Sequence, residues 1–117
     1  GKVYPLEIRY SDKPWRQVLD RDFIERVSSA VLTADRETRG DILVFLPGIG
    51  EIERVRTRLE EQRISREVFP LHGSLSLKDQ KAILKEQDRA RVILATNVAE
   101  ASVTVPGVDF VIDTGLA

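Results

Sequence analysis

Short apolar runs alternate with longer amphipathic stretches along this chain. The clearest run, residues 41–46, reads Asp-Ile-Leu-Val-Phe-Leu, and its length and composition are typical of a strand buried on both faces. Residues 3–10 alternate loosely between apolar and polar positions, which also predicts a strand. The same reasoning predicts further strands at 67–71, 91–95 and 108–112.

Between these runs, apolar residues recur at the spacing of a helix. Phe23, Val27 and Val31 stand four residues apart, which predicts a helix from about residue 18 to residue 34. A similar spacing of apolar residues predicts a second helix over residues 51–62, whose acidic start suits the helix dipole.

A third helix is predicted to begin after Ser76, which forms a capping box with Asp79, and to run to about residue 87. The residues of this helix that are expected to face inward are Leu77, Ile83 and Leu84. A short helical turn is expected from about Asn97.

The alternation of strands and helices predicts an α/β fold, a parallel sheet with helices on both faces. Right-handed connections place the carboxyl ends of parallel strands, and the loops that follow them, along one rim of the sheet. We therefore expect the loops at 47–50, 72–76 and 96–101 to lie side by side. The chain of 117 residues contains no convincing linker or repeat, so we treat it as a single domain.

Composition narrows the possible chemistry. With 42% hydrophobic and 32% charged residues the chain is globular, and its net charge of −1 argues against binding nucleic acid by bulk positive charge. The absence of cysteine excludes disulfides, Cys-ligated zinc and thiol nucleophiles, and is compatible with the cytoplasmic location that we expect. The single histidine excludes a multi-His metal site. No apolar run approaches the ~20 residues of a membrane helix.

Several catalytic motifs are absent. The chain has no P-loop, Gly48 and Gly50 are not followed by the third glycine of a dinucleotide fingerprint, and no Gly-x-Ser-x-Gly elbow occurs. This chain alone therefore holds no complete catalytic set. Because it also contains no methionine, we expect it to be part of a longer protein.

The three rim loops are the remaining candidates, and each has a structural alternative. The glycines at 48 and 50 would let phosphate approach free N–H groups, or they form a turn that binds nothing. The hydroxyls of the 72–76 loop could hold a phosphate oxygen, although Ser76 is explained as a cap and His72 as a loop histidine. Thr96 and Asn97 would present a hydroxyl and an amide, but Asn97 followed by Glu100 is itself a capping pattern.

The third loop carries a family resemblance. Residues 95–105, Ala-Thr-Asn-Val-Ala-Glu-Ala-Ser-Val-Thr-Val, resemble motif V of the DEAH/RHA helicases of superfamily 2. Residues 42–52 resemble motif IV, residues 70–75 the motif that follows it, and residues 111–115 the strand that leads toward motif VI. The resemblance spans roughly residues 3–117, and Pro-Gly-Val after motif V is most similar to the bacterial HrpA-type subfamily.

The resemblance implies the second RecA-like domain of an ATP-dependent RNA helicase. In that family, residues of these motifs contact the backbone of single-stranded RNA, and the matching positions are Gly48, Ser74, Thr96 and Asn97. Later residues of motif V face the nucleotide or couple to it, and the matching positions are Ser102, Thr104 and Pro106. Many members carry an acidic ribose ligand where this chain has Pro106, and a proline side chain has no polar atom to make that contact.

The resemblance also implies partners and cofactors. ATP or another nucleoside triphosphate, with Mg²⁺, would bind mainly to a first RecA-like domain of the same protein, which residues 1–117 do not include, and motif VI is also absent. We expect a monomer that binds single-stranded RNA and no membrane, and we expect these residues alone to be inactive. Two alternatives stay open: a non-catalytic RecA-like module that binds proteins, and a helicase that acts on DNA or RNA–DNA hybrids.

Overall fold

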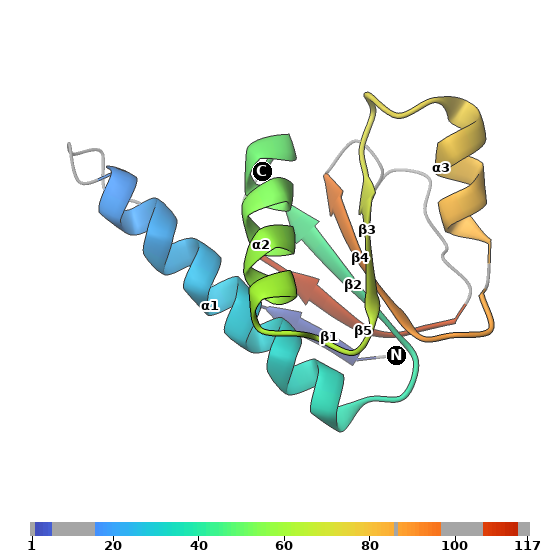
Figure 1. Cartoon of the computed structure of the whole chain (residues 1–117), viewed down its shortest axis with the longest axis horizontal. Coiled ribbons are helices and arrows are strands. Elements are labelled where there is room, and N and C mark those ends of the chain that lie inside the picture. Colours follow the sequence, from blue (N-terminus) through green and yellow to red (C-terminus); the bar gives the residue numbers. More distant parts are fainter. Residues whose placement is uncertain (1, 6–15, 86, 97–106, 115–117) are drawn as a thin grey trace.

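The computed structural model describes residues 2–5, 16–85, 87–96 and 107–114. The strands of these residues form one sheet, and their helices lie on its two faces (Figure 1). The strands are β1 (Lys2–Pro5), β2 (Asp41–Leu46), β3 (Glu67–Leu71), β4 (Arg91–Thr96) and β5 (Val108–Asp113). The helices are α1 (Arg16–Glu37), α2 (Ile49–Glu61) and α3 (Leu77–Leu84).

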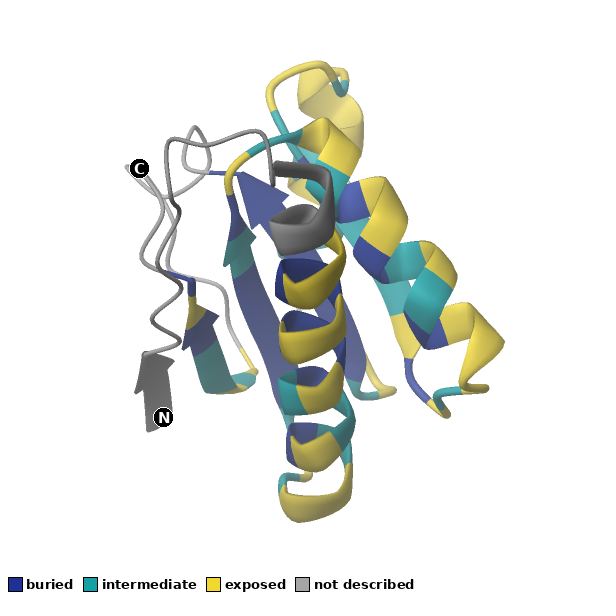
Figure 2. Ribbon diagram, turned by 90° about the vertical axis from the view of Figure 1, so that its left-hand side faces the viewer, coloured by how far each residue is buried: buried dark blue, intermediate teal, exposed yellow. Residues whose placement is uncertain are grey.

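The strands form one parallel five-stranded sheet in the order β1-β5-β2-β4-β3. The central strands are the most buried, and every residue of β4 is buried (Figure 2). Burial on both faces explains why the apolar runs at 41–46 and 91–96 carry almost no polar alternation. The predicted α/β fold is confirmed, although only residues 3–5 of the strand expected at 3–10 are described.

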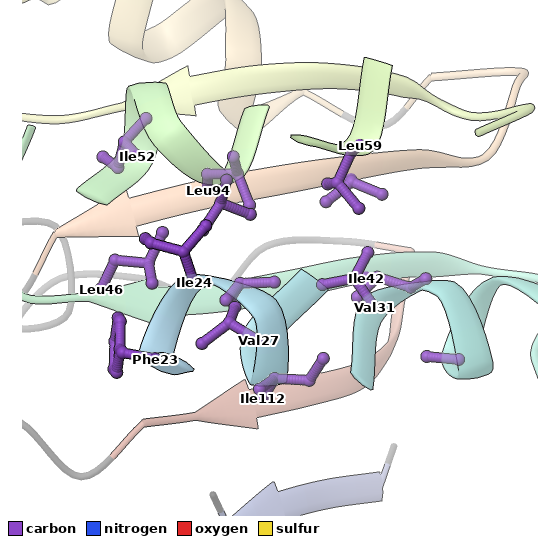
Figure 3. Close-up of a cluster of buried hydrophobic side chains, with 14 residues drawn as sticks. Phe23, Ile24, Val27, Val31, Ile42, Leu46, Ile52, Leu59, Leu94 and Ile112 are labelled. Atoms are coloured by element: carbon purple, nitrogen blue, oxygen red, sulfur yellow. The ribbon is translucent and has the colours of Figure 1, made fainter. Parts of the chain in front are cut away.

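Alternate residues of the central strands face two separate cores. Ile42, Val44 and Leu46 of β2 pack with Leu94 and with residues of α1 and α2 in the larger cluster (Figure 3). The neighbouring positions belong to a smaller cluster on the other face, which includes Leu43, Leu71, Ile93, Ala95 and, from α3, Ile83 and Leu84. Helices therefore cover both faces, with α1 and α2 on one and α3 on the other (Figure 1).

Helix α3 differs from its prediction in two ways. Its cap is confirmed, because the Ser76 Oγ accepts a hydrogen bond of 3.1 Å from the Asp79 amide. The helix ends at Leu84, earlier than expected, and Leu77 is 72% exposed, so the prediction that Leu77 faces inward is wrong. The loop at 72–76 carries the start of α3 past the ends of the strands, so its first turn has little sheet beneath it (Figure 1).

Two buried arginines tie helix ends to the amino edge of the sheet. Arg91, the first residue of β4, pairs with Asp41, the first residue of β2, and its guanidinium also donates to the carbonyls of Ile83 and Lys85 at the end of α3. Arg66 pairs with Asp35 and donates to the carbonyl of Thr38, just beyond the end of α1. Both arginines therefore satisfy carbonyls that a helix leaves unpaired at its C-terminus.

Helix α2 ends in a Schellman motif in which Arg63 adopts an unfavourable backbone conformation. The Ile64 amide donates to the Leu59 carbonyl at 3.2 Å, and the Arg63 amide donates to the Glu60 carbonyl at 3.0 Å. Arg63 adopts a φ of 55°, the left-handed region in which a Cβ atom is unfavourable.

Among the described residues, none of the helices is long and apolar enough to cross a bilayer.

Arg63→Gly is expected to raise the free energy of unfolding by about 0.5–1 kcal/mol, because glycine removes the Cβ penalty while adding some flexibility to the unfolded chain. Urea denaturation of the two chains measures the difference. Arg63→Ala is the control, since it removes the guanidinium but keeps the Cβ atom and should bring no gain. A glycine variant that is less stable than the alanine variant would contradict the prediction.

Candidate functional site at the carboxyl edge of the sheet

The carboxyl ends of three neighbouring strands carry most of the candidate residues. Because β2, β4 and β3 are adjacent and parallel, the segments that follow them start at the same edge. Gly48 follows β2, Ser74 follows β3 and Thr96 ends β4, so the structure brings these three predicted positions to one edge. The other predicted positions lie outside the described residues, namely Asn97, Ser102, Thr104 and Pro106.

The start of α2 presents free backbone donors at this edge. Gly48 is the N-cap, has no side chain to cap the helix, and its carbonyl accepts the bond from Ile52 at 3.1 Å. The preceding N–H groups of the first turn therefore have no partner within the helix. A Cβ atom on Gly50 would meet nothing within 4 Å, and one on Gly48 would meet only the flexible carboxylate of Glu51. Neither glycine is required by packing, and both leave the donors accessible.

Thr96 contributes a buried hydroxyl. The residue is 7% exposed, and its Oγ1 has no hydrogen-bond partner among the described residues. Thr96 lies beside Leu46 in the sheet and shares its strand face with Val92 and Leu94, the face that α2 covers. A buried hydroxyl without a partner costs about 1–3 kcal/mol, so a ligand atom that supplied the partner would recover that cost.

The loop after β3 has its own internal hydrogen bonds. The His72 Nδ1 accepts from the Ser74 amide at 3.3 Å, and the His72 carbonyl accepts from the Leu75 amide at 3.2 Å. His72 is half-buried and Ser74 is exposed. His72 is therefore a loop residue that orients Ser74, which agrees with the structural interpretation of this histidine.

Sequence reasoning assigned no individual role to Thr114, which shapes the same edge. Thr114 is buried, and its Oγ1 donates to the carbonyl of Phe45 at 2.8 Å. This bond joins the segment after β5 to the end of β2, just before Gly48. A hydroxyl residue directly after a buried strand was the only available signal, and it cannot identify an acceptor far away in the sequence.

The donors at this edge suit phosphate oxygens better than a metal ion. Hydroxyl and backbone N–H groups bind anions, whereas proteins usually hold Mg²⁺ through carboxylate oxygens. Within the described ranges, no three His, Asp or Glu side chains lie close enough together to hold a metal. A groove of about 670 Å³ between α1 and α2 lies elsewhere, and its charges include Arg58, which already binds Glu25 at 2.7 Å.

Comparison with known proteins gives the family of this chain. The helicase conserved C-terminal domain matches residues 22–117. The ATP-dependent RNA helicase HrpB of Escherichia coli is 44% identical over 117 residues, 97% of this chain and 14% of HrpB. The ATP-dependent RNA helicase HrpA homolog of Haemophilus influenzae is 40% identical over 100% of this chain and 9% of its own length. The chain thus spans about a tenth of the length of these relatives.

Solved structures agree with the sequence comparison. Two crystal structures of E. coli HrpB, described as a DExH-box NTPase and as a DEAH/RHA helicase, superpose with TM-scores of 0.68 and 0.69. They are 35% and 38% identical to this chain and cover 96% of it, which is 13% and 14% of their own chains. The similarity confirms the expected RecA-like fold. This chain therefore belongs to the family of helicase conserved C-terminal domains, in the DEAH/RHA branch that its motifs resemble.

Proposed function

We propose that this chain is the second RecA-like domain of an ATP-dependent RNA helicase and that its carboxyl edge holds the backbone of single-stranded RNA. The observation that carries the proposal is the buried Thr96 hydroxyl, which has no partner among the described residues. The strand that carries it lies next to β2, whose end leads into the open first turn of α2. HrpA and HrpB are both named ATP-dependent RNA helicases, which supports RNA as the substrate.

The physical role of such a site follows from its donors. Small polar side chains and backbone N–H groups bind phosphate and sugar without reading bases, which a motor that moves along any sequence requires. Gly48, Ser74, Thr96 and Asn97 are the residues that we assign to this contact. His72 is not among them, and its Nδ1 accepts the Ser74 amide within its own loop.

ATP with Mg²⁺ is proposed to bind mainly to the first RecA-like domain, and its hydrolysis would drive the change in position of the two domains. Ser102, Thr104 and Pro106 are the positions of this chain that we assign to the nucleotide side. The part of this chain would be to hold RNA while the domain interface opens and closes. Its monomeric state and cytoplasmic location stay predictions.

Thr96→Val should weaken RNA binding and lower RNA-stimulated ATP hydrolysis, each by about tenfold or more, because a hydrogen bond to a charged group contributes about 1.5–3 kcal/mol. The measurement uses the longest natural protein that contains these residues, with and without single-stranded RNA. Thr96→Ser keeps the hydroxyl and is the matched control. Because no described residue bonds to the hydroxyl, the melting temperature of the valine variant should not fall.

Three results would separate this proposal from its competitors. Unchanged stimulation in Thr96→Val would refute a role in RNA binding. Asn97→Ala that costs only stability, about 0.5–2 kcal/mol, would identify Asn97 as a helix cap instead. Equal stimulation by single-stranded DNA of the same sequence would show that the site does not require the 2′-hydroxyl of RNA.

A further inference from the structure

The outer face of α3 carries a stripe of lysines. Lys78, Lys81 and Lys85 stand three and four residues apart, so they lie on one side of the helix and its C-cap. All three are exposed, and none forms an ion pair with another described residue. Asp79 is rotated by about 100° from Lys78 around the helix and does not neutralise the stripe.

Part of this arrangement works against the stability of α3. Like charges at these spacings repel each other, and Lys78 lies in the first turn, where the helix dipole favours negative charge, although the dipole favours Lys81 in the last turn and Lys85 at the C-cap. The helix is only 8 residues long and has no fully buried residue to offset these terms. Two arginines of α2 are different, because Arg54 pairs with Glu51 and Arg58 with Glu25. An anion outside the described residues would account for the lysine stripe.

The position of the stripe connects it to the carboxyl edge. α3 begins directly after Ser76, where the loop that holds Ser74 ends, and runs back toward the amino edge of the sheet (Figure 1). Lys78 is thus nearest to the proposed RNA site and Lys85 farthest from it. From Lys78 to Lys85 the helix rises about 10 Å, which gives an extended chain of phosphates room to follow the stripe.

We propose that Lys78, Lys81 and Lys85 bind the phosphate backbone of the single strand after it passes the carboxyl edge. The three ammonium groups act as point charges, which suits contact to any sequence. The inference rests on the proposed function, because it extends the same strand from the edge across α3. It adds an electrostatic contact that the motif residues, which are small and uncharged, do not provide.

The test uses the longest natural protein that contains these residues and measures its binding of a labelled oligouridine of about 20 nucleotides by fluorescence anisotropy over a range of salt concentrations. The triple variant Lys78→Gln/Lys81→Gln/Lys85→Gln should lower the slope of log affinity against log salt by about 2, since each lost phosphate contact contributes about 0.7. The triple arginine variant should retain the slope of the unsubstituted chain. Glutamine keeps helix propensity, and it removes both the repulsion and the favourable dipole interactions of Lys81 and Lys85, so the melting temperature should change little.

A matched control removes the same charge from the opposite edge. Arg36, Arg39 and Arg63 are exposed. Arg36 lies in the last turn of α1, and the other two lie in the connections that enter β2 and β3 at the amino edge. Their triple glutamine variant should leave the salt slope almost unchanged. An equal decrease of the salt slope in both variants would overturn the lysine assignment and leave the proposed function standing. The same conclusion would follow if the lysine variant kept its salt slope while Thr96→Val still weakened binding. Failure of the unsubstituted longest natural protein to bind the oligouridine would overturn both.

Discussion

Asp41→Ala is expected to lower the free energy of unfolding by about 3–5 kcal/mol, because it leaves the Arg91 charge buried without its carboxylate. The two side chains are 5% and 2% exposed, and their Oδ2 and Nε atoms lie 3.0 Å apart. The other carboxylate oxygen accepts from the Arg91 amide at 3.0 Å, so the substitution also removes the partner of a buried N–H group.

The position of this pair makes the loss larger than that of one contact. Asp41 and Arg91 are the first residues of the two adjacent central strands, and the Arg91 guanidinium also donates to the carbonyls at the end of α3. Without Asp41, the guanidinium must move toward water or remain unsatisfied, and either response disturbs the contact between α3 and β4. A domain of this size has a total stability of about 5–15 kcal/mol, so the variant should lose a large share of it.

Urea denaturation followed by circular dichroism measures the loss, and Glu25→Ala is the matched control. Glu25 also pairs with an arginine, Arg58, at 2.7 Å, but the two side chains are 55% and 33% exposed. Removal of this exposed pair should cost less than about 1 kcal/mol. Similar losses in the two alanine variants would show that burial of the Asp41 pair does not determine its contribution.

The central strands β2 and β4 were well predicted because a strand buried on both faces consists almost entirely of apolar residues. β2 has the predicted bounds, and β4 differs from its prediction by one residue, Thr96. The order of the strands in the sheet leaves no comparable pattern in the sequence. β5 inserts between β1 and β2 through pairings with residues far away in the sequence, such as Ile42 with Phe110.

The location of the site was predictable from the sequence, but its side-chain contacts were not. Parallel strands require Gly48, Ser74 and Thr96 to share an edge, and the structure confirms that position. That the Thr96 hydroxyl is buried and has no described partner depends on every atom around it, which no spacing along the chain records. The bond from Thr114 to the Phe45 carbonyl and the pairing of Arg91 with Asp41 escaped prediction for the same reason.

Leu94→Ala is expected to lower the free energy of unfolding by about 2–5 kcal/mol, since it removes buried methyl groups and leaves a cavity. Leu94 is 0% exposed and lies in the larger core cluster, between the central sheet and the helices that cover it (Figure 3). Its neighbours come from several elements, including Leu46 of β2 and Ile52 of α2, so no single element can close the cavity by a small movement.

Leu77→Ala provides the same chemical change at a site where the structure contradicts the sequence. Helical periodicity places Leu77 inward, but it is 72% exposed, and alanine has the higher helix propensity. Its variant should therefore unfold within about 0.5 kcal/mol of the original chain. Parallel denaturation of the two leucine variants tests the described position of α3 directly. A large loss in Leu77→Ala would mean that the first turn of α3 packs against the protein, as periodicity alone predicts.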